Sequence, residues 1–288
     1  MNMSQYAQMI RQLKTPEVMK RLNTLYGQRE GMMVAQTTRY TALLKRHEDL
    51  FNTSGPVYMI SAPGRTEISG NHTDHNRGKV LTAAVNLDTV AAVSPREDGM
   101  VNVHSEGYPA ISISLDDLAA REDEKNTTAA LIRGVAYKLQ EEGYKIGGFD
   151  AAVTSTVRGG SGLSSSAAFE VMLCAIFDEL YNQGTLAYKH RAKISQFAEN
   201  VYFGKPSGLL DQLTSAVGGI IFADFADART PKIEKLHADG LLPEGMFLCV
   251  TDTRGSHSEL TGEFAAIRQE MEQVAAALER ILACGEAK

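Results

Sequence analysis

The chain has 288 residues, of which 43% are hydrophobic, and its 29 Lys and Arg against 35 Asp and Glu give a formal net charge of -6. This length predicts one large domain or two small ones, with an ample hydrophobic core. Because the basic residues are scattered and fewer than the acidic ones, the chain lacks the basic excess that neutralises a phosphate backbone, and we expect no nucleic-acid partner.

The first 50 residues mix charged residues with apolar residues at loose helical spacing. This pattern predicts helices on both sides of a turn near residues 27–31. Short apolar runs follow, and they predict strands over residues 57–62, 79–86, 89–94, 101–105 and 110–115. Since Gly and Pro separate several of these runs, we expect a largely antiparallel sheet.

Helices and strands alternate in the second half of the chain. Leu131, Val135 and Leu139 recur every four residues and predict a helix over 127–142, after an acidic stretch that we interpret as a solvated connection. The further expected elements are a strand at 149–157, a glycine-rich turn at 158–163, helices at 164–180 and 187–203, and strands at 219–224 and 247–252.

An apolar stripe marks the last predicted helix. Between residues 264 and 281, apolar side chains repeat at intervals of three and four, and Gly285 is expected to end the helix. Such a stripe needs a covering surface. We expect self-association if nothing in the chain covers it.

Cysteine usage and hydropathy indicate a cytoplasmic protein. The three cysteines, Cys174, Cys249 and Cys284, are odd in number and form no CxxC pair, which is not the pattern of a secreted disulfide framework. Residues 1–27 hold no apolar signal segment, and charges interrupt every later apolar run before the roughly 18 residues needed to cross a bilayer. We therefore expect no membrane partner.

A glycine-rich turn between a predicted strand and a predicted helix is the first chemically suggestive unit. Residues 159–167 are GGSGLSSSA, where glycines let backbone N–H groups approach an anion at the positive end of the helix, and serines can cap the helix or bind phosphate or Mg²⁺. An ordinary helix cap after a flexible turn is the alternative. The turn is neither a Walker A motif, because GxxxxGK[ST] is absent, nor a nucleophile elbow, because Ser166 stands where GxSxG needs glycine.

Polar residues gather between two predicted strands in residues 64–75, GRTEISGNHTDH, which favours a polar site. His72, Asp74 and His75 are similar to part of the HxHxDH ligand set of metallohydrolases. Gly70 stands where the first histidine of that set should be, and no other histidine cluster completes it. Metal-dependent hydrolysis is therefore the weaker interpretation of this segment.

A third segment, residues 204–212, is GKPSGLLDQ. Asp211 follows a Gly/Pro turn inside an apolar stretch, and a carboxylate in such surroundings needs a partner or a role. Glu199 lies 12 residues earlier in a predicted helix, where an acidic residue alone is typical of a solvated face.

Together and in this order, the three segments resemble the galactokinases of the GHMP small-molecule kinase superfamily. Residues 65–81 look like the galactokinase signature, residues 159–168 are similar to the GLSSSA phosphate loop, and residues 206–212 resemble the PxGxxDQ segment. The resemblance runs from about residue 62 to residue 271.

This resemblance implies an α+β fold of the GHMP kinase type with two domains. Residues 1–224 would form the N-terminal domain, with a mixed or antiparallel sheet and helices, and residues 225–288 would begin a C-terminal ferredoxin-like domain. Family members normally continue to a third glycine-rich motif, which nothing after residue 224 resembles, so we expect the second domain to be incomplete.

The resemblance also implies an enzyme that uses ATP and Mg²⁺ to phosphorylate the C1 hydroxyl of galactose. Asp211 would be the catalytic carboxylate, with Arg65 stabilising charge beside it, and Ser166 and Glu199 would be the metal ligands. The positions that match sugar contacts are Asn71, His72, Asp74 and Gly208, and those that match the phosphate loop are Gly159, Gly160, Ser161, Gly162, Leu163, Ser164, Ser165 and Ser166.

Departures from the family signature leave two alternatives open. Asn71 and His75 replace the usual Glu and Tyr, and a neutral amide facing the C6 group would tolerate the carboxylate of a uronic acid better than glutamate does. The first alternative is thus a related sugar 1-kinase with altered C6 specificity, for example towards galacturonate. The second is a sugar- and nucleotide-binding protein without turnover, which the missing third motif favours.

Overall fold

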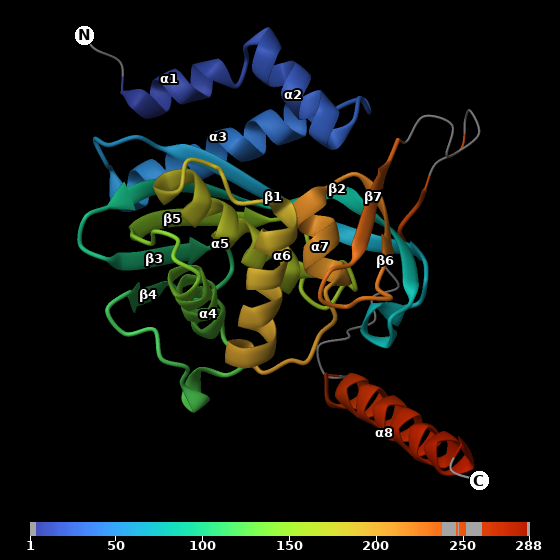
Figure 1. Ribbon diagram of the computed structural model, residues 1–288. Coiled ribbons are helices and arrows are strands. Elements are labelled where there is room, and N and C mark those ends of the chain that lie inside the picture. The colour runs from blue at the N-terminus through green and yellow to red at the C-terminus, as the bar shows by residue number, and fades with distance from the viewer. Residues whose placement is uncertain (1–3, 238–245, 247, 252–260, 287–288) are drawn as a thin grey trace.

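The computed structural model describes residues 4–237, 246, 248–251 and 261–286, and a single mixed sheet organises them (Figure 1). The seven strands have the order β4-β3-β5-β2-β6-β7, with β1 pairing with β2 outside this path. Their bounds are β1 Tyr58–Ser69, β2 Lys79–Arg96, β3 Met100–Ser105, β4 Ile111–Ser114, β5 Gly148–Ser155, β6 Ile220–Asp224 and β7 Lys232–Leu236. All pairs are antiparallel except β3 with β5, which confirms the expected mixed sheet.

Three N-terminal helices cover one face of the sheet (Figure 1). They are α1 Gln5–Gln12, α2 Pro16–Tyr26 and α3 Met32–Phe51, which confirms the prediction of helices around a turn near residues 27–31. Val90 and Ala92 of β2 face this layer, whereas Ala91 and Val93 face the opposite core, because side chains alternate along a strand. β2 is therefore buried on both faces where it runs through the middle of the sheet.

A buried ion pair attaches the N-terminal layer to the sheet. Arg39 of α3 contacts Asp88 of β2, with Nη1 2.6 Å from Oδ1. Tyr26 and Ser61 donate hydroxyl hydrogen bonds of 2.5 Å to Oδ2 of the same carboxylate. Asp88 thus has charged and neutral partners from three elements.

The opposite face carries the helices that lead to the candidate site (Figure 1). They are α4 Thr128–Glu141, α5 Ser165–Tyr181, α6 Tyr188–Phe197 and α7 Leu210–Val217. Between α6 and α7, residues Ala198–Phe203 form a π-helical turn, η3, and short 3₁₀ turns occur at η1 Thr73–Asn76 and η2 Glu122–Glu124. Apolar residues of α4, α5 and α6 pack on β2, β3 and β5 in the largest hydrophobic cluster.

Several predicted boundaries were wrong. The runs at 79–86 and 89–94 form one 18-residue strand, β2. The predicted strand at 247–252 is absent from residues 248–251, and its two end residues lie outside the described residues. The sequence pattern did not indicate β7, which pairs with β6 and continues the sheet beyond residue 224. The division into domains at 224/225 stays a prediction.

The predicted C-terminal helix is α8, Thr261–Glu286, which passes Gly285 instead of ending there. It lies apart from the sheet in Figure 1, and the contact of Met271 Sδ with Asn76 Nδ2, at 3.5 Å, joins it to the η1 turn. Ile267, Val274 and Leu278 on its apolar stripe are more than half exposed. Self-association through this stripe stays a prediction.

Candidate active site

The glycine-rich loop connects the end of β5 to the start of α5. Gly160 and Gly162 have φ values of 72° and 75°, in the left-handed region where glycine is unstrained. Ser164 follows with φ 59°, and α5 begins at Ser165. The first-turn N–H groups of α5 therefore point into the loop, as an anion site requires. Leu163 is buried, so only its backbone is available to a ligand.

Strand β1 passes against this loop. The Arg65 amide donates to Leu163 O at 3.1 Å, and Arg65 Nη1 donates to Gly162 O at 2.7 Å. A Cβ at Gly64 would lie 2.8 Å from Leu163 O, so only glycine lets the strand come this close. The register of β1 with β2 shifts between Pro63 and Arg65, and such bulges re-aim side chains beside active sites.

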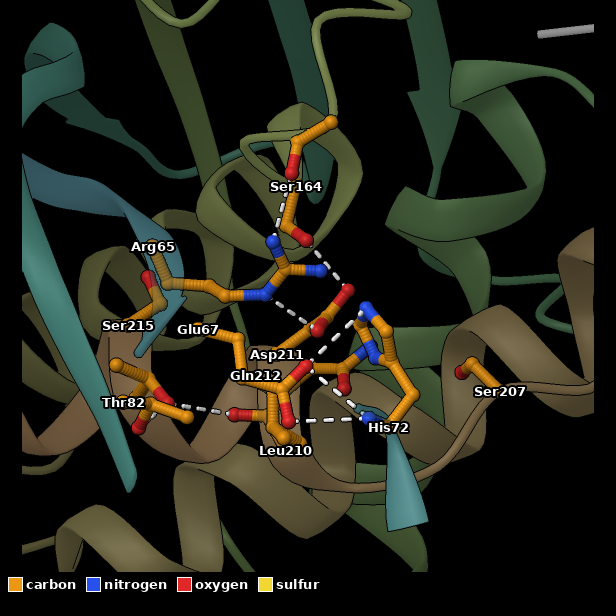
Figure 2. Close-up of polar contacts among 12 residues, drawn as sticks. Arg65, Glu67, His72, Thr82, Ser164, Ser207, Leu210, Asp211, Gln212 and Ser215 are labelled. Atoms are coloured by element: carbon orange, nitrogen blue, oxygen red, sulfur yellow. Dashed lines mark hydrogen bonds and ion pairs between the residues drawn. The ribbon is translucent and has the colours of Figure 1, made fainter. Parts of the chain in front are cut away.

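Arg65 and Asp211 form the centre of the site (Figure 2). Arg65 Nε lies 2.6 Å from Asp211 Oδ1, and the Ser164 hydroxyl donates to Asp211 Oδ2. Burial alone would raise the pKa of Asp211, but the charge and hydrogen bond of Arg65, with the bond from Ser164, outweigh it and lower that pKa below its ordinary value. Asp211 is therefore a carboxylate at neutral pH, 22% exposed.

The segment that joins β1 to β2 lies beside the start of α7. Asp74 is buried, and its Oδ2 accepts a 3.0 Å hydrogen bond from Leu210 N. A Cβ at Gly208 would come within 1.8 Å of the same oxygen, so the absence of a side chain there lets Asp74 reach α7. Asn71 and His72 are exposed and left-handed, and the His72 amide donates to Glu67 Oε1 at 3.0 Å. Figure 2 shows Glu67 directed towards His72.

Ser166 and Glu199 also meet. The Ser166 hydroxyl donates to Glu199 Oε1 at 2.9 Å, from α5 to the π-helical turn η3. Glu199 is 1% exposed, so it does not lie on a solvated helix face. Three more donors approach its carboxylate: Lys205 Nζ at 2.9 Å on Oε1, and Ser207 Oγ at 2.6 Å and Gln212 Nε2 at 2.7 Å on Oε2.

A second buried carboxyl group lies behind Glu199. Glu170 of α5 is fully buried, and its Oε2 accepts a 3.1 Å hydrogen bond from Gln212 Nε2. Burial raises the pKa of Glu170 well above its usual range, and the nearby Glu199 adds to the rise. Its surroundings therefore favour the uncharged form of Glu170.

The metallohydrolase interpretation of residues 64–75 has no ligand set in the structure. Asp74 is hydrogen-bonded to α7, and His72 lies 3.6 Å from Glu67. No group of three His, Cys, Asp or Glu that could hold a metal ion occurs within the described residues.

No helix in the described part of the chain is long and apolar enough to span a membrane.

Two segments of the chain match family models, and the chain is similar to several curated proteins. Residues 45–95 match the model of the galactokinase galactose-binding signature, and residues 130–219 match that of the GHMP kinases N-terminal domain. The chain is 39% identical to a galactokinase from Streptomyces coelicolor over 236 residues, 81% of this chain and 60% of that protein. A Streptomyces lividans galactokinase is 40% identical over 75% of this chain and 53% of that protein. Over these segments the chain is similar to galactokinases and to the GHMP kinases.

The fold agrees with this family. A crystal structure of the Lactococcus lactis galactokinase complexed with galactose matches with a TM-score of 0.66 and 25% identity, covering 82% of this chain and 62% of that one. The expected α+β fold of the GHMP kinase type is confirmed. The chain spans about half to three fifths of the length of these galactokinases.

The galactokinase-family motifs bring together most of the predicted site residues. Asp211 contacts both Arg65 and Ser164. Asp74 contacts α7, and Ser166 contacts Glu199. Their roles stay predictions, as do those of Asn71 and His72. Sequence reasoning missed the residues that surround the carboxylates; they are Glu170, Lys205, Ser207 and Gln212.

Replacement of Arg65 by Gln is expected to raise the pKa of Asp211. The guanidinium is the main group that lowers this pKa, so burial dominates once the charge is gone. Asp211 would then take up a proton at a higher pH than in the wild-type protein. The pH below which any activity is lost would therefore rise. A ¹³C NMR titration of the aspartate carboxyls, assigned with Asp211→Asn, measures the shift; an unchanged or lower pKa would contradict the assigned cause.

Proposed function

We propose that this chain carries the catalytic site of an ATP-dependent kinase that phosphorylates the C1 hydroxyl of galactose. The observation that carries the proposal is the contact of Asp211 with both Arg65 and Ser164, at the mouth of the glycine-rich loop. This contact joins a carboxylate suited to a sugar hydroxyl with a helix N-terminus suited to phosphates. The family match supports the choice of sugar.

Asp211 accepts the hydrogen bond of the C1 hydroxyl and directs its oxygen at the phosphorus. Because the pKa of Asp211 is lowered, the carboxylate orients this hydroxyl more than it abstracts the proton early. Arg65 keeps Asp211 ionised and offers positive charge beside the transferred group. The remaining catalysis is positioning and electrostatic stabilisation, as phosphoryl transfer requires.

Ser166 and Glu199 are the residues that would hold Mg²⁺. Their oxygens lie 2.9 Å apart beside the glycine-rich loop, and one carboxylate with one hydroxyl fits an ion that takes its other ligands from phosphates and water. When bound, Mg²⁺ supplies charge neutralisation for the ATP phosphates. The backbone of residues 159–165 would hold these phosphates at the start of α5. We propose a cytoplasmic location for this reaction.

The proposed function is tested by ADP release with Mg²⁺ and ATP in the presence of galactose, arabinose, galacturonate or glucose. We expect release with galactose. Sugar binding without ADP release from any of the four would instead identify a non-catalytic sugar-binding protein. A preference for another sugar would identify a related sugar 1-kinase.

Asn71 favours the related sugar 1-kinase as a second candidate. It is exposed in a left-handed turn next to His72, on the segment that carries the predicted sugar contacts. If its amide faces the C6 group, Asn71→Glu places a second negative charge near a uronate carboxylate and lowers kcat/KM for galacturonate relative to galactose. The ratio of the two values measures this effect. A relative gain in galacturonate turnover would exclude Asn71 as the C6 determinant.

A further inference from the structure

The carboxylate of Glu199 already has a cation on the oxygen that faces Ser166. Lys205 Nζ lies 2.9 Å from Oε1, the same atom to which the Ser166 hydroxyl donates. Among the residues that the structure describes, the donors to the other oxygen, Oε2, are the neutral groups of Ser207 and Gln212. The ammonium group therefore lies on the oxygen that Ser166 and Glu199 would present to a metal ion.

The buried surroundings of Glu199 require a positive charge close to its carboxylate. Glu199 is 1% exposed, and the fully buried Glu170 shares the Gln212 amide with it. A buried carboxylate without a compensating charge is strongly destabilising. In the part of the chain that the structure describes, Lys205 is the ion-pair partner of Glu199.

The position of Lys205 also allows its ammonium group to move away from Glu199. It lies in the connection between η3 and α7, outside any helix or strand, and its side chain is 35% exposed. The flexible four-carbon stem of a lysine can carry the ammonium to solvent without movement of the backbone. Ser207 and Gln212 would still hold Oε2 in that state.

We propose that Lys205 is a resident counter-cation, which stabilises Glu199 when no divalent cation is bound and competes with that cation for Oε1. Two positive charges on one oxygen repel each other, so binding of the metal displaces the ammonium. The inference rests on the proposed function, because that function makes Ser166 and Glu199 metal ligands. Lys205 thus lowers the affinity for the metal while it keeps the metal-free site stable.

Equilibrium binding of Mn²⁺ tests the competition without turnover. Lys205→Met and the matched control Lys193→Met, an exposed lysine of α6, are titrated with Mn²⁺ by calorimetry in the presence of a non-hydrolysable ATP analogue. Removal of the competing charge is expected to lower the Kd for Mn²⁺ roughly tenfold in Lys205→Met, and the control should match the wild-type protein. Equal or weaker binding by Lys205→Met overturns the inference.

This experiment separates the inference from the proposed function. Tighter Mn²⁺ binding by Lys205→Met, with no ADP release from the wild-type protein, would support the competition and reject the kinase. Failure of Mn²⁺ to bind any of the three proteins would overturn the metal site and the inference together.

Thermal unfolding without metal tests the stabilising role. Lys205→Met leaves Glu199 buried without its ion-pair partner, so its Tm is expected to fall, and addition of Glu199→Gln should restore most of the loss by removing the charge. Glu199→Gln keeps the shape of the side chain, so rescue identifies charge as the cause. An unchanged Tm in Lys205→Met, or no rescue by the second substitution, contradicts the role of Lys205 as counter-cation.

Discussion

Replacement of Asp211 by Asn is expected to abolish ADP release while the protein remains folded. The amide keeps the shape of the side chain, but it has neither the negative charge that pairs with Arg65 nor a carboxylate for the sugar hydroxyl. Loss of both the proton acceptor and the local charge lowers kcat by at least about a thousandfold. A coupled assay for ADP, run beside circular dichroism of the variant, measures the effect.

The control for this variant is Asp227→Asn. Asp227 is an exposed residue whose carboxylate accepts hydrogen bonds from Arg229 and Thr230, its neighbours in the chain. Turnover in this control should equal that of the wild-type protein. Residual turnover of Asp211→Asn within about tenfold of wild type would show that Asp211 is not the catalytic carboxylate.

Gly208→Ala is expected to have the second largest effect, through the sugar site. The added Cβ would lie 1.8 Å from Asp74 Oδ2, which is a severe steric clash. Asp74 must therefore move and lose its hydrogen bond from Leu210 N. Because displacement of a binding group by about 1 Å can reduce the rate roughly a hundredfold, we expect kcat/KM for the sugar to fall by about this factor.

The change should appear in sugar binding and less in nucleotide binding, because the three atoms nearest to a Cβ at Gly208 all belong to Asp74. Gly55→Ala is the matched control: the nearest atom to its Cβ, Thr53 Oγ1, is 3.4 Å away. Titration of sugar and of nucleotide into both variants separates the two sites. Wild-type affinity for sugar in Gly208→Ala would refute the role of Asp74 as a sugar contact.

The helices were predictable from sequence because their apolar spacing is a local property. The full length of strand β2 could not be predicted in this way. Polar residues, Asn86 and Asp88, lie where its two apolar runs meet, yet Asp88 is buried by contact with Arg39 and Tyr26, far away in the chain. A charged residue is accepted inside a strand when a distant partner compensates it, and single-sequence patterns do not contain that partner.

The candidate site was likewise predictable from sequence only in part. Its motif residues are recognisable because their types and spacing are those of one family, and Arg65 and Asp211 indeed meet across 146 residues of sequence separation. The environment of Glu199 was not predictable, because burial depends on how α5, η3 and α7 pack. One signal was present: Glu170 is an acidic residue within the apolar stretch that became α5. An unpaired acid on a buried helix indicates a polar partner on a neighbouring element.

The 18-residue strand β2 also determines how the sheet can open. Its first half pairs with β6 and its second half with β5, while β1 pairs along most of its length. Amide protons in the paired parts of this strand, residues 79–84 and 88–96, should therefore exchange with solvent mainly when the sheet opens cooperatively. Phe225 N, just after β6, donates to Gly78 O at 2.9 Å, so the segment that carries Asp74 cannot loosen at its β2 end without releasing that hydrogen bond. Loosening of the proposed sugar site at this end is thus coupled to separation of β6 from β2.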